Sequence, residues 1–399
     1  MGGPLEGIKV VEMGVWIAGP AAGLVLGDWG ADVVKIEPPG TGDPCRLLLG
    51  MLGVDVPINP VFEMSNRNKR GVVINTKTQE GLAVALDLID QADVFISNMR
   101  MPALEKMGFD PESLMARNER LIYGHGSGYG LAGADVGKAA YDVGAYWSRS
   151  GVADIVGGGG EPLAQRGAFG DFPSGMNLAG GIAAALFARE RTGQGQLVST
   201  SLMRTAVYQL AWDYAILTRL GIPPAYAIRE KLSPTVNCYQ AGDGRWFWLL
   251  GLEGDRHWDA TCRVTGRPDL AEDPRYATHQ GRMEDVSLLV DEFSKVFATK
   301  TRDEWAEIFK GEPLLWWCPV NTLEEALGDP QLHAANCFTD VPDSGTTTMF
   351  PNTPIDFGGE RVEQRQMAPE PGQHTDEVLA ELGRSPEQIA ALRKSGVVA

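Results

Sequence analysis

Short apolar runs alternate with stretches of helical periodicity over the first 200 positions of the chain. Each run is rich in Val and Ile and is followed by Gly, Pro or Asn, as in strands that are buried on both faces. The predicted strands are 7–13, 32–39, 71–75, 93–98, 121–126 and 195–201, and the predicted helices include 21–30, the amphipathic 78–91 and 139–150. This alternation predicts an α/β fold with a doubly wound sheet.

Ligands of such sheets bind at the carboxyl ends of the strands. Those ends hold Gly14 to Trp16, Pro38, Asn75 to Lys77, Asn98 to Arg100 and Gly124 to Gly128. The first β-α-β unit does not carry a dinucleotide fingerprint, because Gly14, Gly19 and Gly23 lack the G-x-G-x-x-G spacing. Trp16 and Ile17 also stand where a pyrophosphate needs bare backbone. We therefore predict that NAD does not bind here.

The pattern changes after Gly221-Ile222-Pro223-Pro224, where a helix that begins near Met203 ends. Residues 221–327 are predicted to form a smaller α+β domain, with a strand at 245–250 and helices from Met283 and Thr301. Residues 1–220 and 328–399 are predicted to form the large domain, which closes with helices at 375–382 and 386–394.

Charge and cysteine usage narrow the class of protein. The 399 residues include 35 basic and 52 acidic side chains, and a net charge of −17 argues against nucleic-acid binding. Arg67, Lys69 and Arg70 form a local basic cluster, for which we expect a solvated face. The five cysteines are scattered, without a CxxC pair, which predicts a reducing cytoplasm, no disulfide framework and no metal site. No signal peptide and no membrane-spanning apolar run is found, so we expect a cytoplasmic protein without a membrane partner.

One carboxylate lies among glycines directly before a helix of small residues. Asp171 is preceded by Gly170 and followed closely by Gly175, and we expect these glycines to leave it open to a bulky ligand. An Asp in front of a helix is most often an N-cap that accepts backbone N–H groups. Spacing alone favours the capping interpretation over catalysis.

The motifs together resemble the family III CoA-transferases, which include formyl-CoA transferase, carnitine CoA-transferase and the α-methylacyl-CoA racemases. The resemblance is carried nearly end to end by residues 4–10, 18–20, 30–37, 66–70, 107–109, 140–143, 170–171, 191–196 and 372–379. It implies a Rossmann-like CoA-binding large domain and an interlaced homodimer of ring-like chains, with the active site between one chain's large domain and the other's small domain. A heteromer with a homologous subunit is the alternative assembly.

By this resemblance Asp171 is the nucleophile, which attacks an acyl-CoA thioester to form a mixed anhydride and then an enzyme-bound CoA thioester. An Asp with the reference pKa of about 3.9 is ionised at neutral pH and needs no general base. CoA enters as substrate, and no permanent cofactor is implied. The resemblance places the CoA site at Val15, Trp16, Pro38, Asn75, Lys77, Asn98, Met99, Arg100, His125, Lys138, Tyr141 and Asp142.

Departures from the family pattern bear on the substrate. Ile17 replaces a Gln of the formate and oxalate enzymes, and Gly251 to Asp255 replace their tetraglycine loop, so a formyl or oxalyl substrate is disfavoured. Trp16 and Trp147 lie in segments that should face the acyl group, which favours a bulky or aromatic acid; a dicarboxylate such as succinate is equally open.

Two other functions remain as alternatives. Tyr141 stands where the racemases carry a His, so racemisation is the second choice, with His125 as a substitute base or, by preference, a loop residue near the cofactor. A non-catalytic CoA-binding subunit is the alternative from another class of protein.

Overall fold

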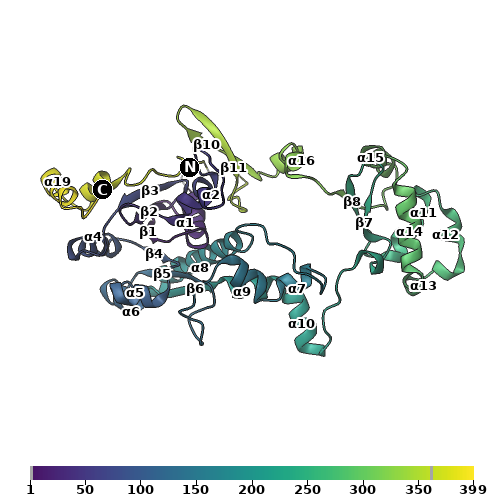
Figure 1. Cartoon of the computed structure of the whole chain (residues 1–399), viewed down its shortest axis with the longest axis horizontal. Coiled ribbons are helices and arrows are strands. Elements are labelled where there is room, and N and C mark those ends of the chain that lie inside the picture. The colour runs from purple at the N-terminus through teal and green to yellow at the C-terminus, as the bar shows by residue number, and fades with distance from the viewer. Residues whose placement is uncertain (1–2, 360–362) are drawn as a thin grey trace. The chain divides into compact units, whose positions relative to one another are not determined.

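The computed structural model describes residues 3–359 and 363–399 (Figure 1). The chain divides into two compact units, one made of the residues up to Pro224 together with His333–Ala399, and the other of Ala225–Leu332.

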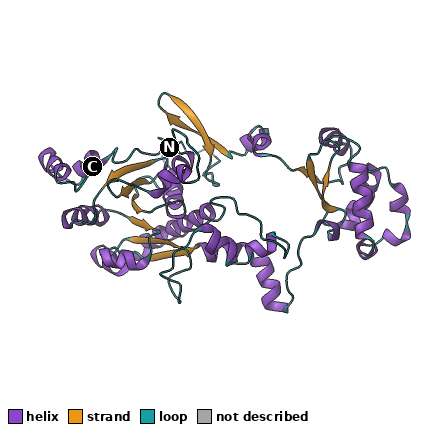
Figure 2. Cartoon of the chain, viewed as in Figure 1, coloured by secondary structure: helices purple, strands orange, loops and turns teal. Residues whose placement is uncertain are grey.

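A six-stranded parallel sheet forms the centre of the first unit (Figure 2). Its strand order is β3-β2-β1-β4-β5-β6, and every neighbouring pair is parallel. The strands are β1 (Lys9–Met13), β2 (Asp32–Glu37), β3 (Lys69–Val73), β4 (Val94–Ser97), β5 (Ile122–Ser127) and β6 (Leu197–Ser201). The order reverses between β1 and β4, and the crevice at this switch point is where ligands of open α/β sheets bind.

Alternate residues of these strands enter two separate cores, because successive side chains of a strand point to opposite faces. Val10 and Ile96 pack with residues of α1 (Ala18–Asp28) and α8 (Asp171–Thr192). Val11 and Phe95 pack on the other face. The helices of that face are α4 (Gln79–Asp90), α5 (Met101–Met107), α6 (Pro111–Arg117), α18 (Thr375–Glu381) and α19 (Pro386–Lys394). Helices on both faces confirm the predicted α/β layer.

The remaining elements of this unit lie in its connections. They are η1 (Pro44–Leu47), α2 (Leu48–Met51), α3 (Pro60–Asn66), η2 (Val143–Ser148), α7 (Val152–Val156), α9 (Leu202–Gln209), α10 (Ala211–Leu220) and the hairpin β10 (Phe338–Asp343) to β11 (Thr346–Pro351). The helix predicted over 139–150 is wrong in type and length, since η2 is a π-helix of six residues. Short π-helices often occur at functional sites.

The basic cluster predicted on a solvated face is buried instead. Arg67 and Lys69 are fully buried, and they pair with Asp28 at 2.7 Å and Glu12 at 2.8 Å. Buried carboxylates require such partners. The sequence prediction failed because it considered the bases without the acids that oppose them.

The second unit has an antiparallel sheet, β7-β8-β9, and an aromatic core. The strands are β7 (Val236–Gln240), β8 (Trp246–Leu250) and β9 (Trp317–Pro319). The helices are η3 (Arg229–Lys231), α11 (Gly254–Val264), α12 (Pro268–Glu272), η4 (Pro274–Tyr276), α13 (His279–Glu284), α14 (Val286–Phe297), α15 (Arg302–Lys310) and α16 (Leu323–Leu327), and α17 (Pro330–Ala334) follows at the boundary. Phe247, Phe293, Phe297 and Trp305 are among the buried rings that hold this unit together.

Candidate active site

Asp171 is the first residue of α8, and its carboxylate does not cap the helix. The N-cap position belongs to Gly170, and no side chain accepts a capping hydrogen bond there. The capping interpretation of Asp171 is therefore wrong. Burial, followed by the negative charge of Asp142, raises the pKa of Asp171 to about 7. The expectation that Asp171 has the reference pKa of Asp is therefore wrong. At neutral pH its protonated and ionised forms are about equally populated.

Asp142 lies immediately before η2 and is buried beside the start of α8. Its Oδ2 accepts the backbone N–H of Gly170 at 2.9 Å, and its Oδ1 has no hydrogen-bond partner among the described residues. A Cβ on Gly170 would lie 2.5 Å from that Oδ1 and 2.3 Å from Cγ of Tyr146. Gly170 thus permits the close approach of η2 to α8, and it is this packing that requires the glycine.

Gly175 has a similar structural role one turn further along α8. A Cβ at this position would lie 2.5 Å from the Cβ of Ala21 on α1. The glycine allows α1 and α8 to pack closely. The expectation that Gly170 and Gly175 open Asp171 to a ligand is thus replaced by a packing role for both.

Aromatic side chains gather around the segment that carries Asp171. Trp16 and Tyr141 meet edge to face, with ring centroids 5.7 Å apart. Phe169 contacts Trp147 in the same geometry at 6.1 Å. Phe172, the residue after Asp171, packs on a buried apolar cluster of Ile17, Cys45 and Phe62. Apolar and aromatic side chains thus flank the segment that carries Asp171, and burial is the first cause of its raised pKa.

A buried chain of charged groups holds Trp16. The backbone of Trp16 is left-handed, with φ of 62°, and its N–H donates to Oδ1 of Asp43 at 2.9 Å. The other oxygen of Asp43 pairs with Lys35 at 2.9 Å, and Lys35 also pairs with Glu12 at 2.9 Å. Such a strained conformation at a large residue persists only where its surroundings impose it. Sequence reasoning missed Asp43 and Lys35, because only the folded chain brings them to Trp16.

Asn98 joins the ends of β1 and β4 at the switch point. It accepts the N–H of Val15 at 2.9 Å and donates to the Val15 carbonyl at 2.7 Å. A Cβ on Gly19 would lie 2.7 Å from Cγ of Asn98, so the first turn of α1 needs a glycine here. Val15, Trp16 and Asn98 are therefore brought together, as the sequence predicts.

A pocket of about 60 Å³ gathers further predicted residues, among them Asn98, Met99, Arg100, His125 and Lys138. Arg100 and Lys138 are exposed cations at its rim. His125 is a buried residue of β5, so its placement in a loop is wrong. Its Nε2 lies 2.9 Å from the Met99 carbonyl oxygen, and burial lowers its pKa.

A larger pocket of about 480 Å³ adjoins Met99 and is also lined by Lys77 and Lys106. Sequence reasoning missed Lys106, although Ala103, Lys106 and Met107 share one face of the helix that directly follows β4. Pro38 and Asn75 line neither pocket. Pro38 is exposed after β2, and Asn75 accepts the N–H of Lys77 at 3.3 Å in the turn before α4.

Comparison with known proteins decides the family. A family model described as CoA-transferase family III matches residues 5–375. The chain belongs to the family III CoA-transferases. It is 36% identical to the (R)-2-hydroxy-4-methylpentanoate CoA-transferase of Clostridioides difficile, with 99% of each chain covered. It is 30% identical to the cinnamoyl-CoA:phenyllactate CoA-transferase of Clostridium sporogenes, with 98% of this chain and 96% of that one covered. The protein is thus an enzyme that transfers CoA between acyl-CoA and acid substrates.

A solved structure agrees with this assignment. The crystal structure of a CAIB/BAIF family protein from Brucella suis superposes with a TM-score of 0.84 at 30% identity, and covers 96% of this chain and 100% of its own. The resemblance found in the sequence motifs is therefore confirmed, as is the mixed α/β fold around a parallel sheet.

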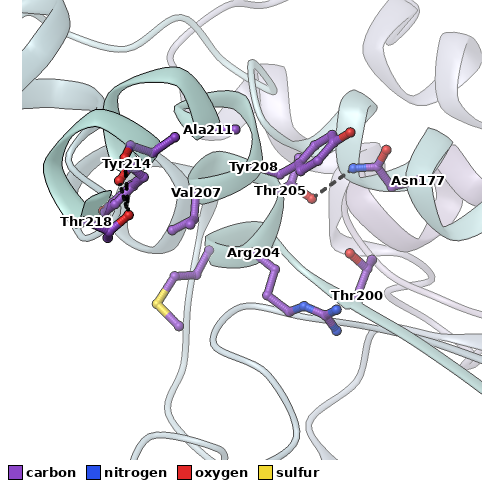
Figure 3. Close-up of a pocket in the computed structure, with 11 residues that line it drawn as sticks. Asn177, Thr200, Arg204, Thr205, Val207, Tyr208, Ala211, Tyr214 and Thr218 are labelled. Carbon is purple, nitrogen blue, oxygen red and sulfur yellow. Dashed lines mark hydrogen bonds between the residues drawn. The ribbon is translucent and has the colours of Figure 1, made fainter. Parts of the chain in front are cut away.

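A further pocket of the family III enzyme, of about 770 Å³, lies at α9 and α10 (Figure 3). Arg204, Tyr208 and Tyr214 are among its lining residues, and Asn177 of α8 donates to Oγ1 of Thr205 across one end at 3.3 Å. None of the predicted site residues lines it.

No group of three or more His, Cys, Asp or Glu side chains within residues 3–359 and 363–399 could hold a metal ion. No helix in the same part of the chain has the length and apolar character needed to span a bilayer.

Proposed function

We propose that this family III CoA-transferase uses Asp171 as its nucleophile. The observation that carries the proposal is the position of the Asp171 carboxylate. It lies partly buried at the start of α8, does not cap the helix, and is flanked by apolar and aromatic side chains. Exclusion of water protects an anhydride and a thioester from hydrolysis, and the ring-lined surroundings suit that need.

The reaction consists of four substitutions at carbonyl carbon. The Asp171 carboxylate attacks the acyl-CoA thioester, the C–S bond breaks, and CoA thiolate leaves a mixed anhydride. The thiolate then attacks the aspartyl carbonyl, which releases the first acid and forms the aspartyl-CoA thioester. The acceptor carboxylate attacks that thioester and displaces the thiolate, which finally attacks the acceptor carbonyl and frees Asp171. Charge and atoms balance at each step, and no metal is required.

We propose that CoA lies along the strand ends of the first unit. Val15 and Trp16 would flank the pantetheine arm, and Pro38, Asn75, Asn98 and Met99 would surround the nucleotide. The cations Lys77, Arg100 and Lys138 would meet the phosphates, and Lys106 joins them in the second pocket. Tyr141 and Asp142 would lie beside the thioester. Support comes from the two pockets, which share Met99 and carry cations at their rims.

We propose a bulky or aromatic acid as one substrate. Trp16, Tyr141, Trp147 and Phe169 supply aromatic surface near Asp171. Two relatives are named for acids with a branched or aromatic side chain, which fits such a surface. A dicarboxylate such as succinate remains the other candidate. Racemisation is less well supported, because His125 is buried against a carbonyl and its pKa is lowered.

We further propose that the enzyme works in the cytoplasm as an interlaced homodimer, or as a heteromer with a homologous subunit. Residues 1–220 and 328–399 would form the CoA-binding domain, and 221–327 the small domain.

A transfer assay with matched variants tests this function. Cinnamoyl-CoA is offered with a panel of carboxylic acids, and new acyl-CoA is followed by mass spectrometry. Asp171→Asn should lose transfer by about a thousandfold or more, because an amide is not a nucleophile. Asp110→Asn is the control, since Asp110 only caps α6, and it should leave transfer unchanged. Full activity of the Asp171→Asn variant would refute the proposal. Exchange of the α-proton with deuterium in the absence of an acceptor acid would favour racemisation instead.

A further inference from the structure

We propose that Asp142 is a positioning residue for the nucleophile: it fixes the backbone immediately before Asp171, and its negative charge sets the pH range in which Asp171 attacks. The inference rests on the proposed role of Asp171 and adds a second carboxylate to it.

The hydrogen bond from Gly170 to Asp142 is the geometric basis. Its length is 2.9 Å, and it joins the residue before η2 to the N-cap of α8. Because Gly170 has no side chain, the carboxylate lies close against the backbone that bears Asp171. Movement of Asp142 would therefore move the nucleophile.

The second oxygen of Asp142 indicates a role beyond this contact. Oδ1 is buried and has no hydrogen-bond partner among the described residues. A buried, unpaired carboxylate oxygen is costly. The side-chain oxygen of an Asn would accept the same backbone N–H of Gly170 without carrying a charge. The hydrogen bond from Gly170 therefore does not explain why residue 142 carries a negative charge.

Among the residues that the structure describes, Asp142 is the charged group that acts on Asp171. Cys45 faces it from η1, and burial raises the pKa of that thiol to about 12, so the thiol is neutral. Tyr146 of η2 is also neutral, since burial and Asp142 raise its pKa, and its hydroxyl donates to Gln209. The positive charge of Lys35 lies near Cys45, but Lys35 is already paired with Glu12 and Asp43.

The like charge changes the energy of the resting enzyme relative to its intermediates. Two neighbouring carboxylates repel each other while Asp171 is ionised. The repulsion disappears when Asp171 becomes part of an anhydride or a thioester, because the acylated side chain is neutral. Asp142 therefore favours the acylated states and makes the free Asp171 carboxylate more basic.

The rate of Asp171 acylation as a function of pH tests this. Enzyme and cinnamoyl-CoA are mixed without acceptor, quenched in acid, and the covalent CoA adduct is measured by intact-protein mass spectrometry from pH 5 to 9. Wild-type acylation should rise with pH around a midpoint near 7, as Asp171 loses its proton. In Asp142→Asn, which keeps an acceptor for Gly170, the midpoint should fall by about one pH unit. The variant should then be severalfold faster than wild type at pH 5.5 and slower above pH 8.

A second variant separates the effect of the Asp142 charge from the effect of its hydrogen bond with Gly170. Asp142→Ala removes the charge and the acceptor, so it should show the lowered midpoint and a lower rate at every pH. A uniform loss of rate with an unmoved midpoint in Asp142→Asn would overturn the inference and leave Asp142 a merely structural residue.

The wild-type profile is decisive even where a variant fails to fold. A wild-type midpoint at or below pH 5 would overturn the inference without any variant. Failure of the proposed function looks different, because then no CoA adduct forms on wild-type Asp171 at any pH.

Discussion

At the scale of single residues, the carboxylate that we propose as the nucleophile, Asp171, also lowers the free energy of unfolding. Its folded pKa of about 7 lies above that of an exposed Asp, so its burial destabilises the fold once the unfolded chain ionises. The penalty is absent well below pH 4, where both states are protonated, and grows until the folded state ionises near pH 7.

Asp171→Asn should therefore stabilise the protein at high pH. We expect the free energy of unfolding to exceed that of wild type by roughly 2–4 kcal/mol at pH 8, and by much less at pH 4.5. Urea unfolding at the two pH values measures the difference. If the difference in unfolding free energy between the variant and wild type does not depend on pH, Asp171 is not a buried acid with a raised pKa.

Asp43 should matter to stability because it pairs with the Lys35 ammonium and accepts the backbone N–H groups of Trp16 and Cys45. In Asp43→Ala, Lys35 loses one of its two counter-ions and the N–H of Trp16 loses its acceptor. Removal of one member of a buried ion pair costs about 3–5 kcal/mol. Asp90→Ala breaks the exposed pair with Arg117 and is the matched control, with a far smaller cost. Equal losses in urea unfolding would contradict the buried network.

At the scale of elements, α8 offers two glycines with opposite expectations. Gly175→Ala places a Cβ 2.9 Å from the backbone carbonyl carbon of Ala21, so α1 and α8 must separate, at about 1–3 kcal/mol. Gly180→Ala meets open space in the same helix and should stabilise by about 0.5–1 kcal/mol. Unfolding measurements on both variants check the packing, and a stabilised Gly175→Ala would contradict it. Transfer activity should fall in Gly175→Ala alone, since only that change disturbs the start of α8.

The sequence predicts elements well where the pattern is local. Six parallel strands were expected within a few residues of their observed positions, because Val- and Ile-rich runs followed by Gly, Pro or Asn have few other solutions. The π-helix η2 and the hairpin from β10 to β11 were not predicted. The burial of Arg67 and Lys69 could not be predicted either, because their partners Asp28 and Glu12 are distant in the chain.

The candidate site likewise has a part that could be predicted from the sequence and a part that could not. Strand-end residues such as Asn98, Met99 and Arg100 follow from the topology, since parallel strands meet a ligand at one edge. The state of Asp171 does not, because its pKa depends on burial and on Asp142, which only the packing of η2 against α8 brings near.

At the scale of the whole molecule, the interlaced dimer is a prediction with a physical signature. Threaded rings cannot separate without unfolding, so dilution alone should not produce monomers. Exposed apolar residues near the pocket of α9 and α10, including Tyr208 and Trp212, offer surface that a second chain would cover. Mass photometry at nanomolar concentration should show dimers after days of dilution. Monomers that appear on dilution would refute interlacing.

The path of carboxylate oxygen tests the central claim most directly. An acceptor acid labelled with oxygen-18 is supplied during turnover, and the peptide that contains Asp171 is then analysed by mass spectrometry. When the thiolate attacks the acceptor carbonyl, the bridging oxygen of the anhydride stays with Asp171, so we predict oxygen-18 in this side chain of the wild-type enzyme. Transfer of CoA at the normal rate with no label in Asp171 would contradict the account.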